Sequence, residues 1–249
     1  MSKLALPKVI GHRGAKAYAP ENTLASIHAA ADMGIEWVEI DVKLTRDSIP
    51  VIFHDEDLVR CTGTSGLMAE TDFKTVIELD AGSWFGESFI NERIPTLEEA
   101  LNVILDRGLG VNLEIKPCPG REVETAEAML DIATRIWPED AAPPLVSSFS
   151  HVSLETAFDM MPEWPRGFLM DDHLENWRDF VEHLQTATIN INGNKRTRDE
   201  IEDYIELQKP ILAYTINDPL KAQELMRWGV DSVFSDCPDV IREALESFH

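Results

Sequence analysis

Short apolar runs alternate with amphipathic segments along almost the whole chain, and this alternation constrains the fold more than any other feature of the sequence. Nine runs rich in Val, Ile and Phe begin with "KVIGHRG" and end with "DSVFSD". Segments with helical periodicity, such as "TLEEALNVILDRG" and "PLKAQELMRWG", lie between most of them. Strands that alternate with helices predict βαβ units and therefore a parallel sheet.

The spacing of the strand ends predicts a closed barrel. The later strand ends follow one another at intervals of roughly 20 residues, which accommodates one strand, one helix and two short loops. We therefore predict an α/β fold, a (β/α)8 TIM barrel, with a doubly wound open sheet as the main alternative. These strand ends lie near Phe149, Leu169, Asn190, Tyr214 and Ser235.

One apolar run, "PVIFHD", does not fit the barrel repeat. It follows "EIDVKLT" after too few residues for a parallel crossover, so we predict an antiparallel hairpin. If Asp47 and Ser48 form a two-residue turn, His54 faces Asp41 across the hairpin. Setting this run aside leaves eight parallel strands, which is the number that the barrel requires.

The chain is long enough for one large domain with a sizeable core, because 44% of its 249 residues are hydrophobic. We predict a single domain over residues 1–249, in which residues 56–95 form a small insertion after the second barrel strand and its hairpin. Trp84, Phe85 and Phe89 of this insertion either cover the mouth of a cavity or anchor the insertion to the barrel.

The charge of the chain excludes several classes of partner. Asp and Glu number 45 against 22 Lys and Arg, which gives a net charge of −23. This charge disfavours nucleic acid and anionic membrane surfaces, because both require cationic contacts to phosphates. No apolar run approaches the roughly 20 residues of a membrane-spanning helix, so we predict no membrane anchor. Three scattered cysteines suit a reducing compartment, and we predict a cytoplasmic location.

Carboxylates lie near the ends of two predicted barrel strands. Glu39 and Asp41 in "WVEIDVKL" project from the same face of one strand, and Glu114 lies in the run "GVNLEIKP". Barrel interiors are normally filled with apolar side chains, and three buried carboxylates without partners are costly. A divalent cation is the natural compensation, and ligation by oxygen alone favours Mg²⁺ or Ca²⁺ over Zn²⁺.

Two imidazoles and two cationic side chains end the same set of strands. His12 and Arg13 follow the first strand, the hairpin brings His54 back, and Lys116 follows the carboxylate of "LEIKP". Two imidazoles can divide the proton transfers of a hydrolysis, while a guanidinium and an ammonium bind phosphate oxygens. This combination suits cleavage of a phosphodiester and supplies the local positive site that the overall charge lacks.

Each of these groups also has a structural explanation. An "HRG" tripeptide occurs by chance, and the carboxylates of "EID" could face solvent. Glu114 and Lys116 could form a buried ion pair, and His54 with Asp55 could cap a turn. Their common position at strand ends favours the catalytic interpretation, because the carboxyl ends of barrel strands carry the active site.

The chain resembles the glycerophosphodiester phosphodiesterase family in motifs that occur in the family's order and cover almost the whole sequence. They are "GHRGAKAYAPENT", "EIDVKLTRDSIPVIFHD", "DLVRCTGTSG", "IPTLEEAL", "LEIKP", "SSF", "YTIND" and "DSVFSDCPD". The resemblance implies metal-dependent hydrolysis of glycerophosphodiesters to sn-glycerol 3-phosphate and an alcohol. Attack by the substrate's own hydroxyl, through a cyclic phosphate, and direct attack by water both remain open.

The resemblance also implies roles for individual residues. By similarity, His12 and His54 are the acid/base pair, and which of them is the base stays open. The remaining implied roles are metal ligation by Glu39, Asp41 and Glu114, and phosphate binding by Arg13 and Lys116.

Three further residues are predicted to contact or support the substrate. Glu21 in "PENT" either supports the site by hydrogen bonding or only marks a helix start, with Asn22 or Thr23 as the cap. Phe149 lines the glycerol site by similarity, and Tyr214 stands where the family often has Trp. Residues 56–95 resemble the small cap domain of the family.

Two other functions compete with hydrolysis of small glycerophosphodiesters. One is a lysophospholipase D or sphingomyelinase D type of activity on larger lipids, which the acidic chain disfavours. The other is a phosphate-binding barrel without catalysis, which is expected to lack a metal ligand or a histidine. We predict a small-molecule substrate as the partner, and the sequence specifies neither the preferred alcohol nor the oligomeric state.

Overall fold

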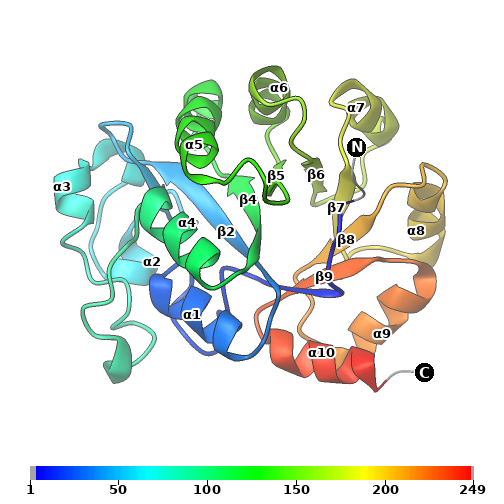
Figure 1. Cartoon of the computed structure of the whole chain (residues 1–249), viewed down its shortest axis with the longest axis horizontal. Coiled ribbons are helices and arrows are strands. Elements are labelled where there is room, and N and C mark those ends of the chain that lie inside the picture. Colours follow the sequence, from blue (N-terminus) through cyan, green and yellow to red (C-terminus); the bar gives the residue numbers. More distant parts are fainter. Residues whose placement is uncertain (1–3, 248–249) are drawn as a thin grey trace.

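The protein folds into a closed barrel of parallel strands surrounded by helices (Figure 1). The computed structural model describes residues 4–247, so the ends of the predicted 1–249 domain lie outside it. Strands β1 and β2 pair with each other and close the ring, which confirms the predicted (β/α)8 barrel. The barrel strands are β1 (Val9–Gly11), β2 (Trp37–Leu44), β4 (Gly110–Ile115), β5 (Leu145–Ser148), β6 (Arg166–Met170), β7 (Thr188–Asn192), β8 (Ile211–Tyr214) and β9 (Ser232–Ser235).

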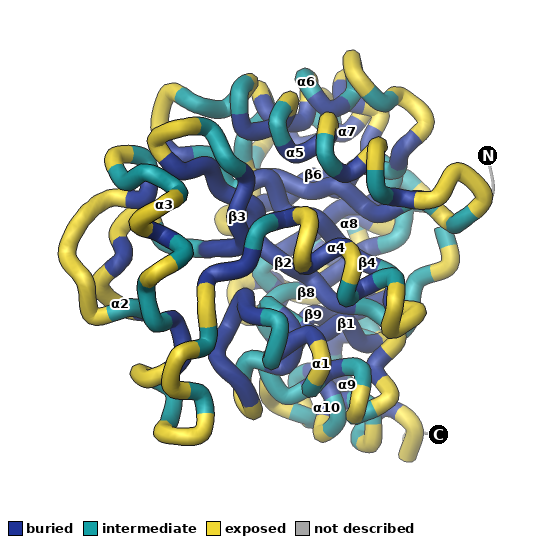
Figure 2. Tube along the Cα trace, turned by 60° about the vertical axis from the view of Figure 1, so that its left-hand side comes forward, coloured by how far each residue is buried: buried dark blue, intermediate teal, exposed yellow. Residues whose placement is uncertain are grey.

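The helices between the strands pack on the outside of the barrel, and their outer turns face solvent (Figure 2). Thr96 caps one of these helices, with its hydroxyl accepting from the Glu99 backbone amide in a capping box. None of the helices among residues 4–247 is both long and apolar enough to cross a membrane. These helices are α1 (Leu24–Asp32), α4 (Leu97–Asp106), α5 (Glu122–Ile136), α6 (His151–Met160), α7 (Trp177–His183), α8 (Arg198–Ile205), α9 (Pro219–Trp228) and α10 (Pro238–Glu246).

The alternation along β2 shows how the sequence divides core from site. Val38, Ile40 and Val42 point outward and pack against the surrounding helices, in a cluster that also includes Leu97 of α4. The residues between them are Glu39, Asp41 and Lys43, and all three are buried inside the barrel. Side chains alternate between the two faces of a strand. Because the apolar residues of β2 pack in the outer core, the charged residues between them point into the barrel.

The hairpin forms as predicted, but its register differs from the expected one by a residue. Strand β3 (Pro50–Ile52) pairs antiparallel with β2, and Leu44 lies opposite Pro50. Thr45 and Ile49 are joined by a three-residue loop, in which Ser48 adopts a left-handed conformation with φ of 62°. This loop type replaces the predicted two-residue turn. Asp41 therefore accepts a backbone hydrogen bond from Phe53, and the prediction that it faces His54 was wrong.

Residues 56–95 depart from the barrel on the side where the hairpin extends, at the left of Figure 1. Their short elements surround a small apolar cluster that includes Leu58, Met68 and Val76 and continues onto Val51 of β3. This cluster fixes the insertion to the hairpin rather than to the outer helices. The elements are α2 (Val59–Thr62), η1 (Met68–Glu70), α3 (Phe73–Val76) and η2 (Glu87–Phe89).

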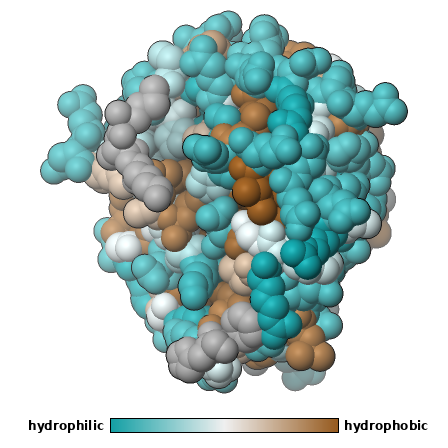
Figure 3. Space-filling model, turned by 90° about the vertical axis from the view of Figure 1, so that its right-hand side faces the viewer, coloured by the Kyte–Doolittle hydropathy of each residue, from teal (hydrophilic) through white to brown (hydrophobic). Residues whose placement is uncertain are grey.

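The surface agrees with the acidic composition. The face shown in Figure 3, at the right of Figure 1, is mostly hydrophilic, with apolar side chains in scattered patches. Most charged residues therefore lie on the solvated exterior, while a smaller set, which includes Glu39, Asp41 and Arg166, is buried.

Candidate active site

The carboxyl ends of the strands surround a cavity of about 370 Å³. A second cavity, of about 690 Å³, adjoins it and shares His54, Glu114, Lys116 and Phe149 in its lining. Eight of the ten predicted site residues line the first cavity, while Asp41 and Glu21 lie behind its wall. The eight are His12, Arg13, Glu39, His54, Glu114, Lys116, Phe149 and Tyr214.

Three carboxylates meet inside the mouth of the barrel. Asp41 of β2 lies opposite Glu114 of β4 in the parallel register, and Glu39 lies two residues earlier on the same inner face. One oxygen from each of the three lies within 4.8 Å of the others, and all three residues are buried. This is the spatial convergence that the spacing of "EID" and "LEIKP" predicts.

The carboxylate trio is not neutralised by the surrounding protein. Oε1 of Glu39 is buried without a hydrogen-bond partner. Burial, together with Asp41 and Glu114, raises the pKa of Glu39 well above its ordinary value. Burial and Asp41 raise the pKa of Glu114 to about 7, against the opposing effect of Lys116. Glu39 and Glu114 therefore bind protons more tightly than ordinary carboxylates. This indicates that the site carries excess negative charge.

Arg13 and Lys116 provide the only cations in direct contact with the trio among the described residues. Arg13 Nε lies 3.2 Å from Asp41 Oδ2, and Lys116 Nζ lies 2.7 Å from Glu114 Oε1. Burial alone raises the pKa of Asp41, but Arg13 and Lys116 reverse that effect and hold it well below its usual range. Asp41 is therefore ionised, and the two cations stand at the cavity wall where an anion would meet them.

The backbone of Arg13 is held in an unusual conformation. Its φ is 52°, in the left-handed region that few residues other than glycine adopt. The amide of Arg13 donates to Glu39 Oε2 over 3.0 Å, and its carbonyl accepts from the amide of Asn22. These bonds fix the strained residue, as is common at functional sites.

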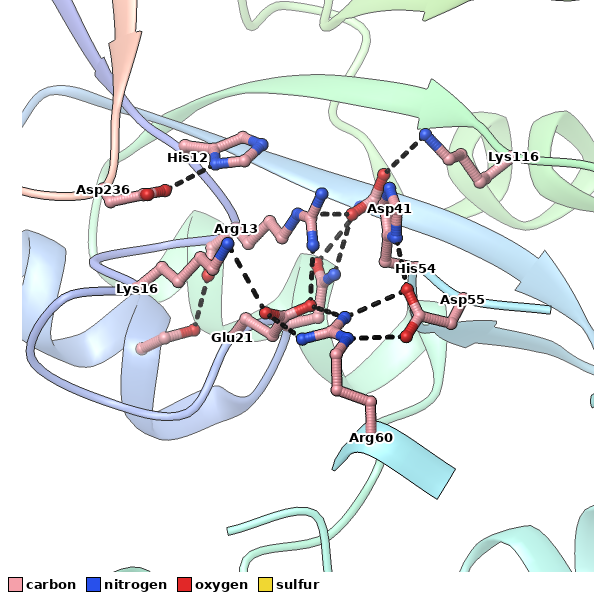
Figure 4. Close-up of polar contacts among 12 residues, drawn as sticks. His12, Arg13, Lys16, Glu21, Asp41, His54, Asp55, Arg60, Lys116 and Asp236 are labelled. Atoms are coloured by element: carbon pink, nitrogen blue, oxygen red, sulfur yellow. Dashed lines mark hydrogen bonds and ion pairs between the residues drawn. The ribbon is translucent and has the colours of Figure 1, made fainter. Parts of the chain in front are cut away.

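Each predicted catalytic histidine is held by an aspartate through one ring nitrogen (Figure 4). His12 Nδ1 lies 2.7 Å from Asp236 Oδ1, and His54 Nδ1 lies 2.6 Å from Asp55 Oδ1. Burial lowers the pKa of both imidazoles, although Asp236 partly opposes this for His12 and Asp41 for His54. An aspartate on Nδ1 fixes the ring orientation and leaves Nε2 for chemistry.

The two aspartates were not predicted as site residues. Asp55 follows His54 directly, and the sequence suggested only that the pair could cap a turn. Asp236 lies in "SDCPD", one residue beyond the end of β9, which is the position where barrel enzymes place functional groups. Burial raises the pKa of Asp236, but the hydrogen bond and charge of His12, together with Lys16 and Asn217, reverse this effect and bring it to about 2.

The helix-start motif "PENT" serves both of the purposes that the sequence left open. Thr23 caps α1, with its hydroxyl accepting from the Ser26 amide, which confirms the helix start. The side-chain Nδ2 of Asn22 instead donates to Asp41 Oδ2 over 2.8 Å. Glu21 accepts from Arg13 Nη1 over 2.7 Å and from a residue outside the prediction, Arg60 of α2.

The comparisons with known proteins agree with this geometry. Residues 12–240 match the model of the glycerophosphoryl diester phosphodiesterase family. The chain belongs to this family. The match confirms the resemblance that the sequence motifs indicate.

Relatives of this phosphodiesterase support the assignment over nearly its whole length. A phosphodiesterase from Oleispira antarctica, solved in complex with the product sn-glycerol-3-phosphate, is 45% identical, with a TM-score of 0.94. The superposition covers 97% of this chain and 98% of that one. A glycerophosphodiester phosphodiesterase from Caldanaerobacter subterraneus is 30% identical over 94% of this chain and 95% of its own length. The relative YhdW from Bacillus subtilis is 32% identical over 94% of this chain and 96% of its own length.

Aromatic residues form one wall of the phosphodiesterase cavity. The rings of Phe149 and Tyr214 meet edge to face, with their centroids 5.8 Å apart. The Tyr214 hydroxyl donates to the Met170 carbonyl over 2.8 Å, so it is already occupied by the backbone. The ammonium of Lys116 lies 5.1 Å from the centre of the Phe149 ring. This wall offers an apolar surface beside a cationic group.

The aromatic residues of the insertion do not line the cavity. Trp84 packs edge to face on Phe85, and Phe85 does the same on Phe89. The guanidinium of Arg60 lies 6.0 Å from the Trp84 ring. These contacts support packing within the insertion. The cavity lining also includes polar residues that the sequence did not indicate, namely Asn112, Asn192, Asn194 and Thr215.

Proposed function

We propose that this family member hydrolyses small glycerophosphodiesters to sn-glycerol 3-phosphate and an alcohol, with a divalent cation bound by Glu39, Asp41 and Glu114. The observation that carries the proposal is the convergence of three buried carboxylates between two histidines, each held by an aspartate. The product bound to the Oleispira relative supports the choice of substrate.

The residues present fit a divalent cation. Glu39 Oε1 is a buried oxygen without a partner, and the carboxylate oxygens are close enough to share one ion. An all-oxygen set is typical of Mg²⁺ or Ca²⁺, and we propose one of these two ions. When bound, such an ion supplies positive charge that stabilises the negative charge developing on the phosphate.

Residues of the chain itself bind and orient the diester. Arg13 presents a guanidinium fork and Lys116 an ammonium at the cavity wall, and both suit phosphate oxygens. In the overall negative field of the molecule, these two cations together with a bound divalent ion would make the mouth of the barrel acceptable to an anion. The wall formed by Phe149 and Tyr214 contacts the carbon skeleton of the substrate.

His12 and His54 divide the proton transfers in the proposed mechanism. One imidazole removes the proton from the attacking hydroxyl as the new P–O bond forms, and the other protonates the alcohol oxygen as the old P–O bond breaks. The low pKa of both rings keeps a fraction unprotonated near neutral pH, as a base requires. The attacking hydroxyl belongs either to water or to the glycerol moiety. In the second case the first step gives a cyclic phosphate, and water then opens it to sn-glycerol 3-phosphate.

Release of sn-glycerol 3-phosphate from glycerophosphocholine tests the proposal directly. We expect turnover with Mg²⁺ or Ca²⁺, loss of turnover after chelation, and recovery when one of the ions is restored. Full activity after exhaustive metal removal would contradict the cation site. Lysophosphatidylcholine, assayed in parallel, separates this function from activity on larger lipids, and preferred cleavage of the lipid would favour that alternative. The cytoplasmic location and the lack of a nucleic-acid partner stay predictions.

A further inference from the structure

Arg60 lies outside the cavity but joins two parts of the machinery that line it (Figure 4). It belongs to the short helix α2 of the insertion, and its guanidinium lies between two carboxylates. Arg60 Nη1 and Nη2 donate to Glu21 over 2.8 and 2.7 Å. Arg60 Nε and Nη2 donate to Asp55 over 2.6 and 3.0 Å. The guanidinium thus serves two carboxylates at once.

Each of the two carboxylates bound by Arg60 continues to a predicted functional side chain. Asp55 Oδ1 holds His54 Nδ1 at 2.6 Å. Glu21 Oε1 accepts from Arg13 Nη1 over 2.7 Å. An unbroken chain of hydrogen bonds therefore runs from the imidazole of His54 through Arg60 to the guanidinium of Arg13.

We infer that Arg60 is a positioning residue of the phosphodiesterase: it orients His54 through Asp55 and Arg13 through Glu21. This inference rests on the proposed function, since it assigns Arg60 to the same reaction. It also gives the insertion a role in catalysis that does not require its aromatic residues to cover the cavity.

The charges around Arg60 agree with this role. Burial raises the pKa of Glu21, but the hydrogen bond from Arg60 and the charge of Arg13 reverse the effect and bring it to about 2. The pKa of Asp55 likewise falls to about 2, because Arg60 and His54 outweigh burial. Both carboxylates are thus ionised, and each is fixed from opposite sides by Arg60 and by the group that it orients.

The exposure of Arg60 allows its role to be tested without unfolding the protein. Its side chain is 42% exposed, and the buried carboxylate of Glu21 keeps Arg13 and Lys16 as cationic partners when Arg60 is replaced. Lysine cannot replace it fully, because an ammonium is a point charge that cannot hold both carboxylates in the planar geometry of a guanidinium. The structure therefore offers a substitution that keeps the charge and removes the shared geometry.

The test combines single variants, a double variant and a matched control, all assayed on glycerophosphocholine with Mg²⁺. Arg60→Ala should lower kcat about tenfold through Asp55 and raise KM about threefold through Glu21. In the Asp55→Asn background, Arg60→Ala should change kcat by less than about twofold but still raise KM. Arg60→Lys should keep the wild-type melting temperature and recover only part of kcat.

The control is Arg46→Ala, which removes a similar pair between the hairpin loop and Asp72 of the insertion, distant from both histidines in the hydrogen-bond network. We expect kcat and KM of this variant to stay within about twofold of wild type. If Arg46→Ala lowered kcat as much as Arg60→Ala, Arg60 would only attach the insertion to the barrel, and the inference would be overturned.

Two further outcomes would overturn the positioning role. One is wild-type kcat and KM in folded Arg60→Ala. The other is a kcat loss that simply multiplies with that of Asp55→Asn. If Arg60→Ala does not fold, full activity of Arg60→Lys contradicts the role instead. A wild-type protein that does not cleave the diester would refute the proposed function, which is a separate result.

Discussion

The two ends of the barrel both bury charge, but they treat it in opposite ways. At the mouth, Glu39 keeps one oxygen without a hydrogen bond, beside two other carboxylates. At the base, where β6 begins, the buried guanidinium of Arg166 donates to five backbone carbonyls and lies 4.6 Å from the Phe158 ring. These carbonyls belong to Met161, Pro162, Trp164, Leu184 and Gln185.

This difference separates a buried charge that has a structural role from one that belongs to a functional site. Met161 and Leu184 cap the carboxyl ends of α6 and α7, whose carbonyls carry partial negative charge. Arg166 is therefore satisfied by the fold itself, and its role is structural. Oε1 of Glu39, in contrast, accepts from no described residue, and such a buried atom indicates a site for a ligand. Substitutions at the two ends should consequently have opposite effects on activity and stability.

The largest effect should follow from removing one charge at the mouth. Glu39→Gln keeps the shape of the side chain but weakens cation binding, so we expect kcat to fall by about a thousandfold. The free energy of unfolding of the metal-free protein should stay the same or rise, because repulsion among the carboxylates decreases. Urea denaturation and a diesterase assay measure both quantities, with the exposed Glu98→Gln as control. A Glu39→Gln variant that is less stable but fully active would show that Glu39, like Arg166, has a structural role.

A smaller loss should follow from removing either imidazole. His12→Ala and His54→Ala should each lower kcat about a hundredfold with the fold intact, because each removes one proton transfer. Steady-state kinetics with circular dichroism measure this, and exposed His28 on α1 provides the control as His28→Ala. A near-normal rate in either catalytic variant would remove that histidine from the mechanism.

At the base, the expected effect is on stability alone. Arg166→Met removes the donor from the carbonyls of the buried residues Trp164 and Leu184, and we expect the free energy of unfolding to fall by about 2 kcal/mol. The kcat value should stay within about twofold of wild type, because no contact of Arg166 reaches the cavity. Arg107→Met on the exposed end of α4 is the matched control. Loss of activity in the folded Arg166 variant would show that the two ends are not independent.

The smallest effect concerns pH. Because the pKa of Glu114 is raised to about 7, its protonated form stabilises the metal-free fold fully at low pH. That stabilisation disappears as the pH rises through about 7. Mg²⁺ or Ca²⁺ should therefore raise the melting temperature by about 3 °C more at pH 8 than at pH 5.5, where the ion must displace protons. Thermal denaturation of wild type and Glu39→Gln measures this difference, and equal gains at both pH values would contradict it.

Much of the mouth could be predicted from the sequence because its residues follow strand periodicity. Glu39 and Asp41 share a face of one strand, and Glu114 occupies the matching position on its neighbour. The strand–helix alternation likewise predicted the barrel, and the "PENT" motif marked the start of α1. These features depend on local rules that the sequence expresses directly.

Other features depend on contacts between distant segments. The hairpin register shifted because Ser48 adopts a left-handed conformation, which only glycine or asparagine would have suggested. The partners of Arg60 and Arg166 lie on other elements, and in the second case they are backbone carbonyls without any sequence signature. Asp236 was visible in a motif, but only the closure of the barrel brings it to His12.

The pairing of His12 with Asp236 spans 224 residues and joins the first and last strands of the ring. A nascent chain that has not yet added β9 lacks this pair, even when every carboxylate of the mouth has been synthesised. Hydrolytic competence should therefore arrive late during translation, at the moment of ring closure. Premature fragments that carry most of the motifs would remain inert toward cellular phosphodiesters.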